Sequence, residues 1–232
     1  MQSVNSRSGV LRVGEKIQFT DRKGKRITAQ LVAGGVTQTE HGLICHDDVI
    51  GQSEGVVITT VSAKRETQQT IVDPSKSSNK PWKAARAIGG WDYVVMRPRM
   101  VDYVLSMPRG AQIMYPKDIA QVIALGDIRS GMRVLESGAG SGAMSLSLLD
   151  AVGECGKLTT IELRPDFARI AESNATLYYG KRPEWWNLLT GDFDSVAKTL
   201  DAHSVDRIML DMLDPWNRLG SSMSSICLLY TS

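Results

Sequence analysis

The feature that most constrains the fold is a glycine-rich turn between a predicted strand and a predicted helix. Residues 132–136 are expected to form the strand, glycines follow at positions 138, 140 and 142, and the helix runs through Leu149. Glycine lets a backbone turn tightly and approach a ligand without Cβ clashes. The free N–H groups at the start of the next helix favour anionic or polar ligand atoms. The turn therefore predicts a nucleotide-type binding site.

From about residue 116 the chain alternates predicted strands and helices. Besides the elements around the turn, strands are expected at 157–162, 187–190 and 206–211, and helices at 118–125 and 165–177. Strands that alternate with helices of this length indicate a parallel, doubly wound α/β sheet.

The N-terminal part has a different pattern. Short β-branched runs broken by turns, such as 16–20, 27–32 and 55–61, predict a small all-β domain, a barrel or a sandwich. A polar, basic, turn-rich stretch follows, which predicts a connector, with contact to RNA as the alternative. We therefore expect the following division: a β domain at 1–72, a linker and connecting helix at 73–115, the glycine-turn domain at 116–220 and an atypical tail at 221–232.

Composition excludes several classes of protein. The chain has 232 residues, of which 42% are hydrophobic and 22% charged, as in ordinary folded proteins. No apolar run approaches the roughly 20 residues needed to span a bilayer, and the N-terminus lacks the apolar core of a secretory signal. Cys45, Cys155 and Cys227 lie far apart. That spacing predicts neither disulfides nor a metal site and is typical of a cytoplasmic protein.

Charge is distributed unevenly along the chain. Residues 1–120 carry 17 Lys and Arg against 11 Asp and Glu, whereas residues 121–232 carry 10 against 14. A basic half beside an acidic half marks an RNA-facing surface in some proteins. Scattered solubilising charge accounts for the same counts, so both interpretations stay open.

Three ligands compete for the glycine turn. No Gly-Lys-Ser/Thr follows it, which excludes an ATP-binding P-loop. A dinucleotide stays open, because Gly138, Gly140 and Ala143 satisfy the loose GxGxxG/A pattern. The run from Glu136 to Gly142, an acid followed by three alternating glycines, resembles the class I methyltransferase signature. That resemblance implies S-adenosylmethionine as the cofactor.

Three blocks carry a closer resemblance: RGAQIMYPKD at 109–118, VLESGAGSGA at 134–143 and DMLDPW at 211–216. Together they are similar to the tRNA adenine-N1 methyltransferases of the TrmI type, in particular to an actinobacterial branch, from about residue 9 to 216. The resemblance implies methylation of N1 of the T-loop adenine at tRNA position 58 by a homotetramer. The alternatives are a non-catalytic tRNA-binding subunit and a small-molecule or protein methyltransferase.

The resemblance also assigns cofactor contacts. Glu162, at the end of the second strand, would hold the ribose, and Asp192, after the third, the adenine amine. Phe167 would pack near the adenine, with a place in the core as the alternative. The full expected set is Glu136, Gly138, Gly140, Ser141, Gly142, Ala143, Met144, Glu162, Phe167 and Asp192.

The resemblance also implies a catalytic pair. Asp211 ends the fourth strand and would face the target adenine, and Tyr115 would help to hold that base. Trp216 is an alternative aromatic for the base, although a core anchor after Pro215 is favoured. The expected tRNA phosphate contacts, with plain surface charge as the alternative, are Arg97, Arg99, Arg109 and Lys117.

The resemblance fades after Trp216. Residues 221–232 do not match the helix that the family has there, and later strands of the sheet are not found. We therefore expect a truncated or chimeric sequence whose sheet is incomplete. The corresponding hypothesis is that this chain alone is an inactive or poorly soluble fragment.

Overall fold

The computed structural model describes residues 7–62, 89–223 and 226, and divides into two compact units, residues 1–99 and 100–232. The first unit is all-β. Its main sheet is antiparallel in the order β2-β1-β6-β5. The strands of this sheet are β1 (Lys16–Asp21), β2 (Arg26–Gln30), β5 (Val57–Thr59) and β6 (Asp92–Met96). A separate hairpin joins β3 (Val36–Thr39) to β4 (Gly42–Cys45) and leads into the 3-10 helix η1 (His46–Asp48).

The core of this unit lies under the main sheet. Ile17 and Phe19 of β1 are fully buried and pack with Tyr93 and Val95 of β6. The small all-β N-terminal domain is thus confirmed. The first part of the predicted connector, residues 73–88, lies outside the described residues, but its residues 92–96 form a strand. The linker prediction was wrong there, because alternate side chains of β6 are buried, a period of two that belongs to a strand.

The second unit is built on a parallel sheet in the order β10-β7-β8-β9. Its strands are β7 (Arg133–Ser137), β8 (Lys157–Glu162), β9 (Trp186–Thr190) and β10 (Arg207–Leu210). The helices before and between them are α1 (Met100–Ser106), α2 (Pro116–Leu125), α3 (Ala143–Val152), α4 (Pro165–Tyr179) and α5 (Phe193–Ala197). The 3-10 helix η3 (Pro215–Arg218) and the short helix α6 (Leu219–Met223) follow β10.

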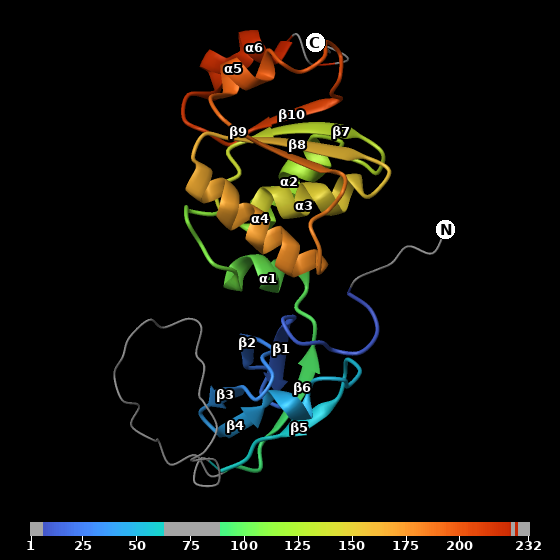
Figure 1. Ribbon diagram of the computed structural model, residues 1–232, viewed down its shortest axis with the longest axis vertical. Coiled ribbons are helices and arrows are strands. Elements are labelled where there is room, and N and C mark those ends of the chain that lie inside the picture. Colours follow the sequence, from blue (N-terminus) through green and yellow to red (C-terminus); the bar gives the residue numbers. More distant parts are fainter. Residues whose placement is uncertain (1–6, 63–88, 224–225, 227–232) are drawn as a thin grey trace. The chain divides into compact units, whose positions relative to one another are not determined.

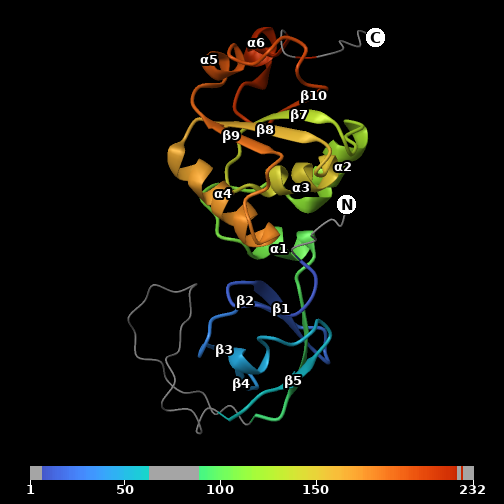
Figure 2. The ribbon, with the colours of Figure 1, turned by 45° about the vertical axis from the view of Figure 1, so that its right-hand side comes forward.

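Helices cover both faces of this sheet (Figure 1). Helices α2, α3 and α4 lie on one face, and α5 and α6 on the other, as a second view confirms (Figure 2). The side chains of successive residues of β7 point to opposite faces of the sheet. Val134 packs into the core under α3, whereas Leu135 packs with Phe193 and Ala197 of α5. The doubly wound parallel α/β sheet that was expected for the second unit is therefore confirmed.

The end of the chain differs from its prediction in one place. Residues 221–223, assigned to an atypical tail, continue helix α6, and Ile226 forms a bridge with Val205. The rest of that tail lies outside the described residues. Among the described helices, none combines the length and apolar character that a membrane crossing requires.

Candidate active site

The glycine turn brings the ends of two strands into direct contact. Gly138 has a φ of +94°, and a Cβ placed there would lie 2.0 Å from the backbone oxygen of Asp211. Gly142 caps α3 with a φ of +85°, and its Cβ would press on Ala171 of α4. Gly138 therefore requires glycine for conformation and for space, and the positive φ of Gly142 favours glycine there. As a result, the turn lies between the end of β10 and the first half of α4.

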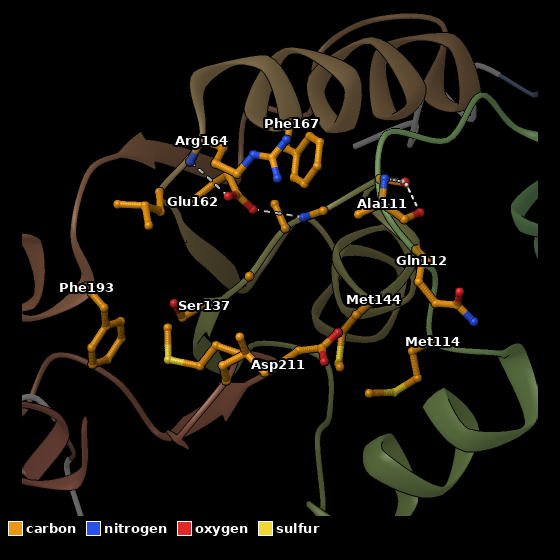
Figure 3. Close-up of a pocket in the computed structure, with 18 of the residues that line it drawn as sticks. Ala111, Gln112, Met114, Ser137, Met144, Glu162, Arg164, Phe167, Phe193 and Asp211 are labelled. Carbon is orange, nitrogen blue, oxygen red and sulfur yellow. Dashed lines mark hydrogen bonds between the residues drawn. The ribbon is translucent and has the colours of Figure 1, made fainter. Parts of the chain in front are cut away.

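A pocket of about 470 Å³ opens beside this turn (Figure 3). It lies at the carboxyl ends of the parallel strands, where ligands bind in open α/β sheets. Its walls come from the turn, from the segment after each of the four strands, and from the stretch before α2. The lining residues that the sequence predicted are Gly138, Gly140, Ser141, Ala143, Met144, Glu162, Phe167, Asp192 and Asp211.

Glu162 is held in place by backbone donors. The N–H of Gly140 donates to its Oε2 at 2.9 Å, and the N–H of Arg164 donates to its Oε1 at 2.9 Å. The side chain is 5% exposed but lines the pocket. Its carboxylate thus ties the glycine turn to the end of β8 and presents its remaining lone pairs to the cavity.

Glu136 lies beneath the turn, not on the pocket wall. It is fully buried, and the hydroxyls of Ser145 and Thr160 donate to its Oε2 at 2.7 and 2.8 Å. Its Oε1 has no hydrogen-bond partner within the part of the chain that the structure describes. Burial raises the pKa of Glu136 to about 7. Its two hydroxyl donors oppose this rise, and the charges of Asp211 and Glu162 add to it.

Glu136 was expected to contact the cofactor, as was Gly142, and neither lines the pocket. The reason in each case is burial behind the turn: Glu136 faces α3 and Gly142 faces α4. Both support the turn from behind.

The part of the pocket beside Glu162 is aromatic and charged. Phe167 of α4 lines it, and the guanidinium of Arg164 stacks on that ring at 3.6 Å. Asp192 also lines the pocket while its carboxylate caps α5, accepting from the N–H of Ser195 at 3.1 Å. The stacking of Arg164 on Phe167 was not predicted. The position of Arg164, two residues after Glu162 at the end of a strand, could have indicated that it lies at the pocket.

Asp211 follows β10 directly, and its N–H donates to the oxygen of Ser137 at 2.9 Å. It projects into the pocket from a different strand than Glu162 does (Figure 3). Desolvation raises the pKa of Asp211, although the side chain is exposed at the rim. Met144 and Met114 line the same cavity, so a carboxylate and two polarisable apolar side chains share one wall.

Neither of the two aromatic residues expected to hold the target base lines the pocket. Tyr115 precedes α2, is 48% exposed and does not line the cavity. Trp216 is 65% exposed, so its favoured interpretation as a core anchor was wrong. Because α2 begins with Pro116, the chain turns away from the cavity at Tyr115. The preceding residues Gln112 and Met114, which were not predicted, line the pocket instead.

Of the four residues expected to contact tRNA phosphates, one is buried and three are exposed. Arg97 is buried in the first unit and pairs with Glu15 at 2.8 Å and Glu54 at 3.0 Å. Its assignment to tRNA was wrong, because these acids and two backbone oxygens take up its donors. The other three are exposed, namely Arg99, Arg109, which donates to the oxygen of Leu105, and Lys117, which pairs with Asp118.

Two family models match the chain. One, described as TrmI-like N-terminal, covers residues 9–58, and the other, described as tRNA methyltransferase complex GCD14 subunit, covers residues 90–228. The described elements of both units fall largely inside these matches.

Known proteins resemble this chain in sequence or in structure. A TrmI tRNA (adenine(57)-N(1)/adenine(58)-N(1))-methyltransferase of Methanocaldococcus jannaschii is 34% identical over 59% of this chain and 56% of its own length. The TrmI tRNA (adenine(58)-N(1))-methyltransferase of Thermus thermophilus is 30% identical over 86% of this chain and 66% of its own. A solved structure of an S-adenosylmethionine-dependent O-methyltransferase from Thermotoga maritima matches with a TM-score of 0.72 and 27% identity, over 94% of this chain and 69% of that one.

The chain thus spans 56% and 66% of the length of those two TrmI relatives. The larger family match includes all four strands of the parallel sheet, the glycine turn and the pocket. On this match, the chain belongs to the tRNA methyltransferase family of the GCD14 subunit, with a TrmI-like N-terminal domain.

Proposed function

We propose that this chain binds S-adenosylmethionine and, as part of a TrmI-type enzyme, directs its methyl group to N1 of the T-loop adenine at position 58 of tRNA. One observation carries the proposal. A single pocket joins the glycine turn and Glu162 at one end to Asp211 and two methionines at the other. A cofactor and an acceptor base need adjoining places of this kind. The TrmI relatives supply the identity of the base.

The residues present fit this cofactor. A volume of about 470 Å³ lies within the range of small-molecule sites. The carboxylate of Glu162, fixed by two backbone N–H groups, is suited to accept hydrogen bonds from ribose hydroxyls. Phe167 offers a ring face for the adenine, and Asp192 an acceptor for its amine. When bound, the cofactor supplies an electrophilic methyl group on a sulfonium.

The chain's own residues then have to orient the acceptor. Adenine N1 has a free lone pair at neutral pH, so no strong general base is needed before attack. Asp211, which lines the pocket, would accept a hydrogen bond from the exocyclic amine of the target base. That contact would align N1 with the methyl group and offset the positive charge that develops on the ring. Met114 and Met144 would keep the reacting centre apolar and exclude water.

The target base has to leave its stack, because N1 lies on the Watson–Crick edge. Gln112 and Leu213 line the pocket toward solvent and are suited to receive the displaced base. Tyr115, which is exposed three residues after Gln112, remains a proposed stacking partner. Arg99, Arg109 and Lys117 are the proposed phosphate contacts. A homotetramer and a cytoplasmic location belong to the same proposal, and light scattering would test the former.

The test is transfer of a tritiated methyl group to unmodified tRNA, with an adenine-to-guanine change at position 58 as the control. We expect labelling of the first substrate and none of the second. Labelling of both would refute the proposed target. A chain that binds the cofactor without transferring label would support the second candidate, a non-catalytic tRNA-binding fragment. Calorimetry with Glu162→Ala tests the cofactor site separately, because it requires no turnover.

A further inference from the structure

A buried asparagine on α4 connects the glycine turn to the segment before α2. Asn174 is 2% exposed. Its side-chain amide donates to the oxygen of Ser141 at 2.9 Å and to the oxygen of Pro108 at 3.0 Å. These two bonds use both donors of the amide. One side chain therefore holds a residue of the glycine turn and a residue of the neighbouring segment at the same time.

Ser141 makes a second connection between the same two pieces. Its hydroxyl accepts from the N–H groups of Gly110 and Ala111 at 3.1 and 3.2 Å, and it lies 3.1 Å from the oxygen of Ala111, to which it donates. Ser141 is itself 2% exposed. The hydroxyl thus has its full set of partners, all of them backbone groups of one short segment.

Packing reinforces both connections. A Cβ at Gly110 would lie 2.6 Å from Ile170 and 3.0 Å from Phe167, so the segment rests directly on α4. The hydroxyl of Tyr103, on α1, donates to the backbone oxygen of Asn174 at 2.8 Å. Asn174 is therefore fixed from α1 while it fixes the other two elements.

The two connected pieces line different parts of one pocket. The turn contributes residues 138–141, on the side where Glu162 lies, and the segment contributes residues 111–114, toward the wall that Met144 forms. If the turn is where the cofactor binds, the segment is where the acceptor base has to be received. Their relative position then sets the geometry of transfer, and a small displacement of either lowers the rate strongly.

We propose that Asn174, together with Ser141, is a latch that keeps the acceptor-facing segment in register with the cofactor-binding turn, which makes Asn174 a positioning residue for methyl transfer. This role rests on the proposed function for its consequence in catalysis, but the latch itself exists in the ligand-free chain. Ligand binding at the turn should therefore increase the order of the segment. This coupling between the turn and the segment should disappear when the latch is removed.

Amide hydrogen exchange on the full chain tests this, with and without S-adenosylhomocysteine as the probe ligand. In the ligand-free chain, Asn174→Ala should speed exchange at Gly110 and Ala111 by about tenfold or more. Their N–H groups donate to Ser141, and the variant removes the bonds that hold Ser141 and Pro108 together. In the unchanged chain the ligand should slow exchange across residues 110–114, and in Asn174→Ala it should not. Ser173→Ala is the matched control, since Ser173 is the exposed neighbour on α4.

A second variant keeps the test decisive if Asn174→Ala does not fold. Ser141→Ala removes the other connection and should speed exchange at the same two amides.

In transfer assays Asn174→Ala should lower kcat about tenfold while the cofactor Kd changes less than about threefold.

The outcomes separate the latch from the proposed function. Exchange in the variants within about twofold of the control would overturn the latch. Equal slowing by the ligand in Asn174→Ala and in the unchanged chain would overturn the coupling. An unchanged chain that binds no S-adenosylhomocysteine would instead refute the cofactor assignment, and the ligand-free comparison would still decide whether the latch exists.

Discussion

Replacing Glu136 with glutamine should make the folded chain more stable at neutral and alkaline pH. Glu136 is fully buried under the glycine turn, where desolvation opposes its charge. The two hydroxyls that donate to Oε2 compensate only in part, because Oε1 finds no partner among the described residues. The pKa is raised from an ordinary 4.5 to about 7. Glutamine has the same shape and cannot ionise.

The magnitude follows from that pKa. Moving it from 4.5 to about 7 corresponds to roughly 3 kcal/mol between the two protonation states. The folded state holds the proton more tightly than the unfolded state, so Glu136 favours folding most at low pH. This contribution is lost as pH rises through about 7. Glu136→Gln should match the unchanged chain near pH 4.5 and exceed it by about 3 kcal/mol at pH 8.

Urea unfolding at several pH values between 4.5 and 8, followed by circular dichroism, measures the difference. Other titrating groups largely cancel, because both proteins contain them. Glu172→Gln, a change at a half-exposed acid on α4 that pairs with Arg182, is the control and should shift stability by about 0.5 kcal/mol or less at every pH. A difference between Glu136→Gln and the unchanged chain that does not vary with pH would show that burial leaves this carboxyl unperturbed, and the reasoning would fail.

Four further changes separate the other roles. Glu162→Gln should raise the Kd for S-adenosylhomocysteine about tenfold to a hundredfold in calorimetry, because a charged acceptor is lost. Asp211→Asn should lower the single-turnover rate about a hundredfold with little change in that Kd, and an equal loss of binding would contradict its assignment. Arg97→Ala should destabilise the first unit by about 3 kcal/mol in urea unfolding, since two acids lose their partner; a loss of tRNA affinity alone would instead restore its nucleic-acid role. Gly138→Ala should cost about 3 kcal/mol or more, because its Cβ meets the Asp211 backbone, and a normal melting temperature would exclude that clash.

Much of the second unit could be predicted because its signals are local. The strand β8 occupies the residues expected for it. Helix α4 starts where it was expected and ends at Tyr179 instead of residue 177. Period, proline at the helix start and glycine at the turns fix such elements within a few residues of sequence. The strand β6 was missed because its partners β1 and β5 lie far away in the chain. The sequence around β6 does not show with which strands it pairs.

The site could be predicted to the same extent, and for the same reason. Residues next to strand ends, such as Glu162 and Asp211, line the pocket because the topology of a parallel sheet places all carboxyl ends at one edge. Asn174 could not be found in this way. It lies in the middle of a helix, where its residue type suggests nothing, and it acquires a role only through contacts with Ser141 and Pro108.

Three acids of this site differ in chemistry although the sequence presents them alike, each at or near the end of a strand. Glu136 has no access to solvent and incomplete partners, so it resists ionisation and supports the turn from behind. Glu162 is nearly as buried, yet two backbone N–H groups donate to it, which suits a fixed acceptor of ligand hydrogen bonds. Asp211 stands at the rim, where its carboxylate is free to meet an incoming base. Because the residue types are so similar, the role of each carboxyl group depends on its environment, and in particular on how many hydrogen-bond donors reach it.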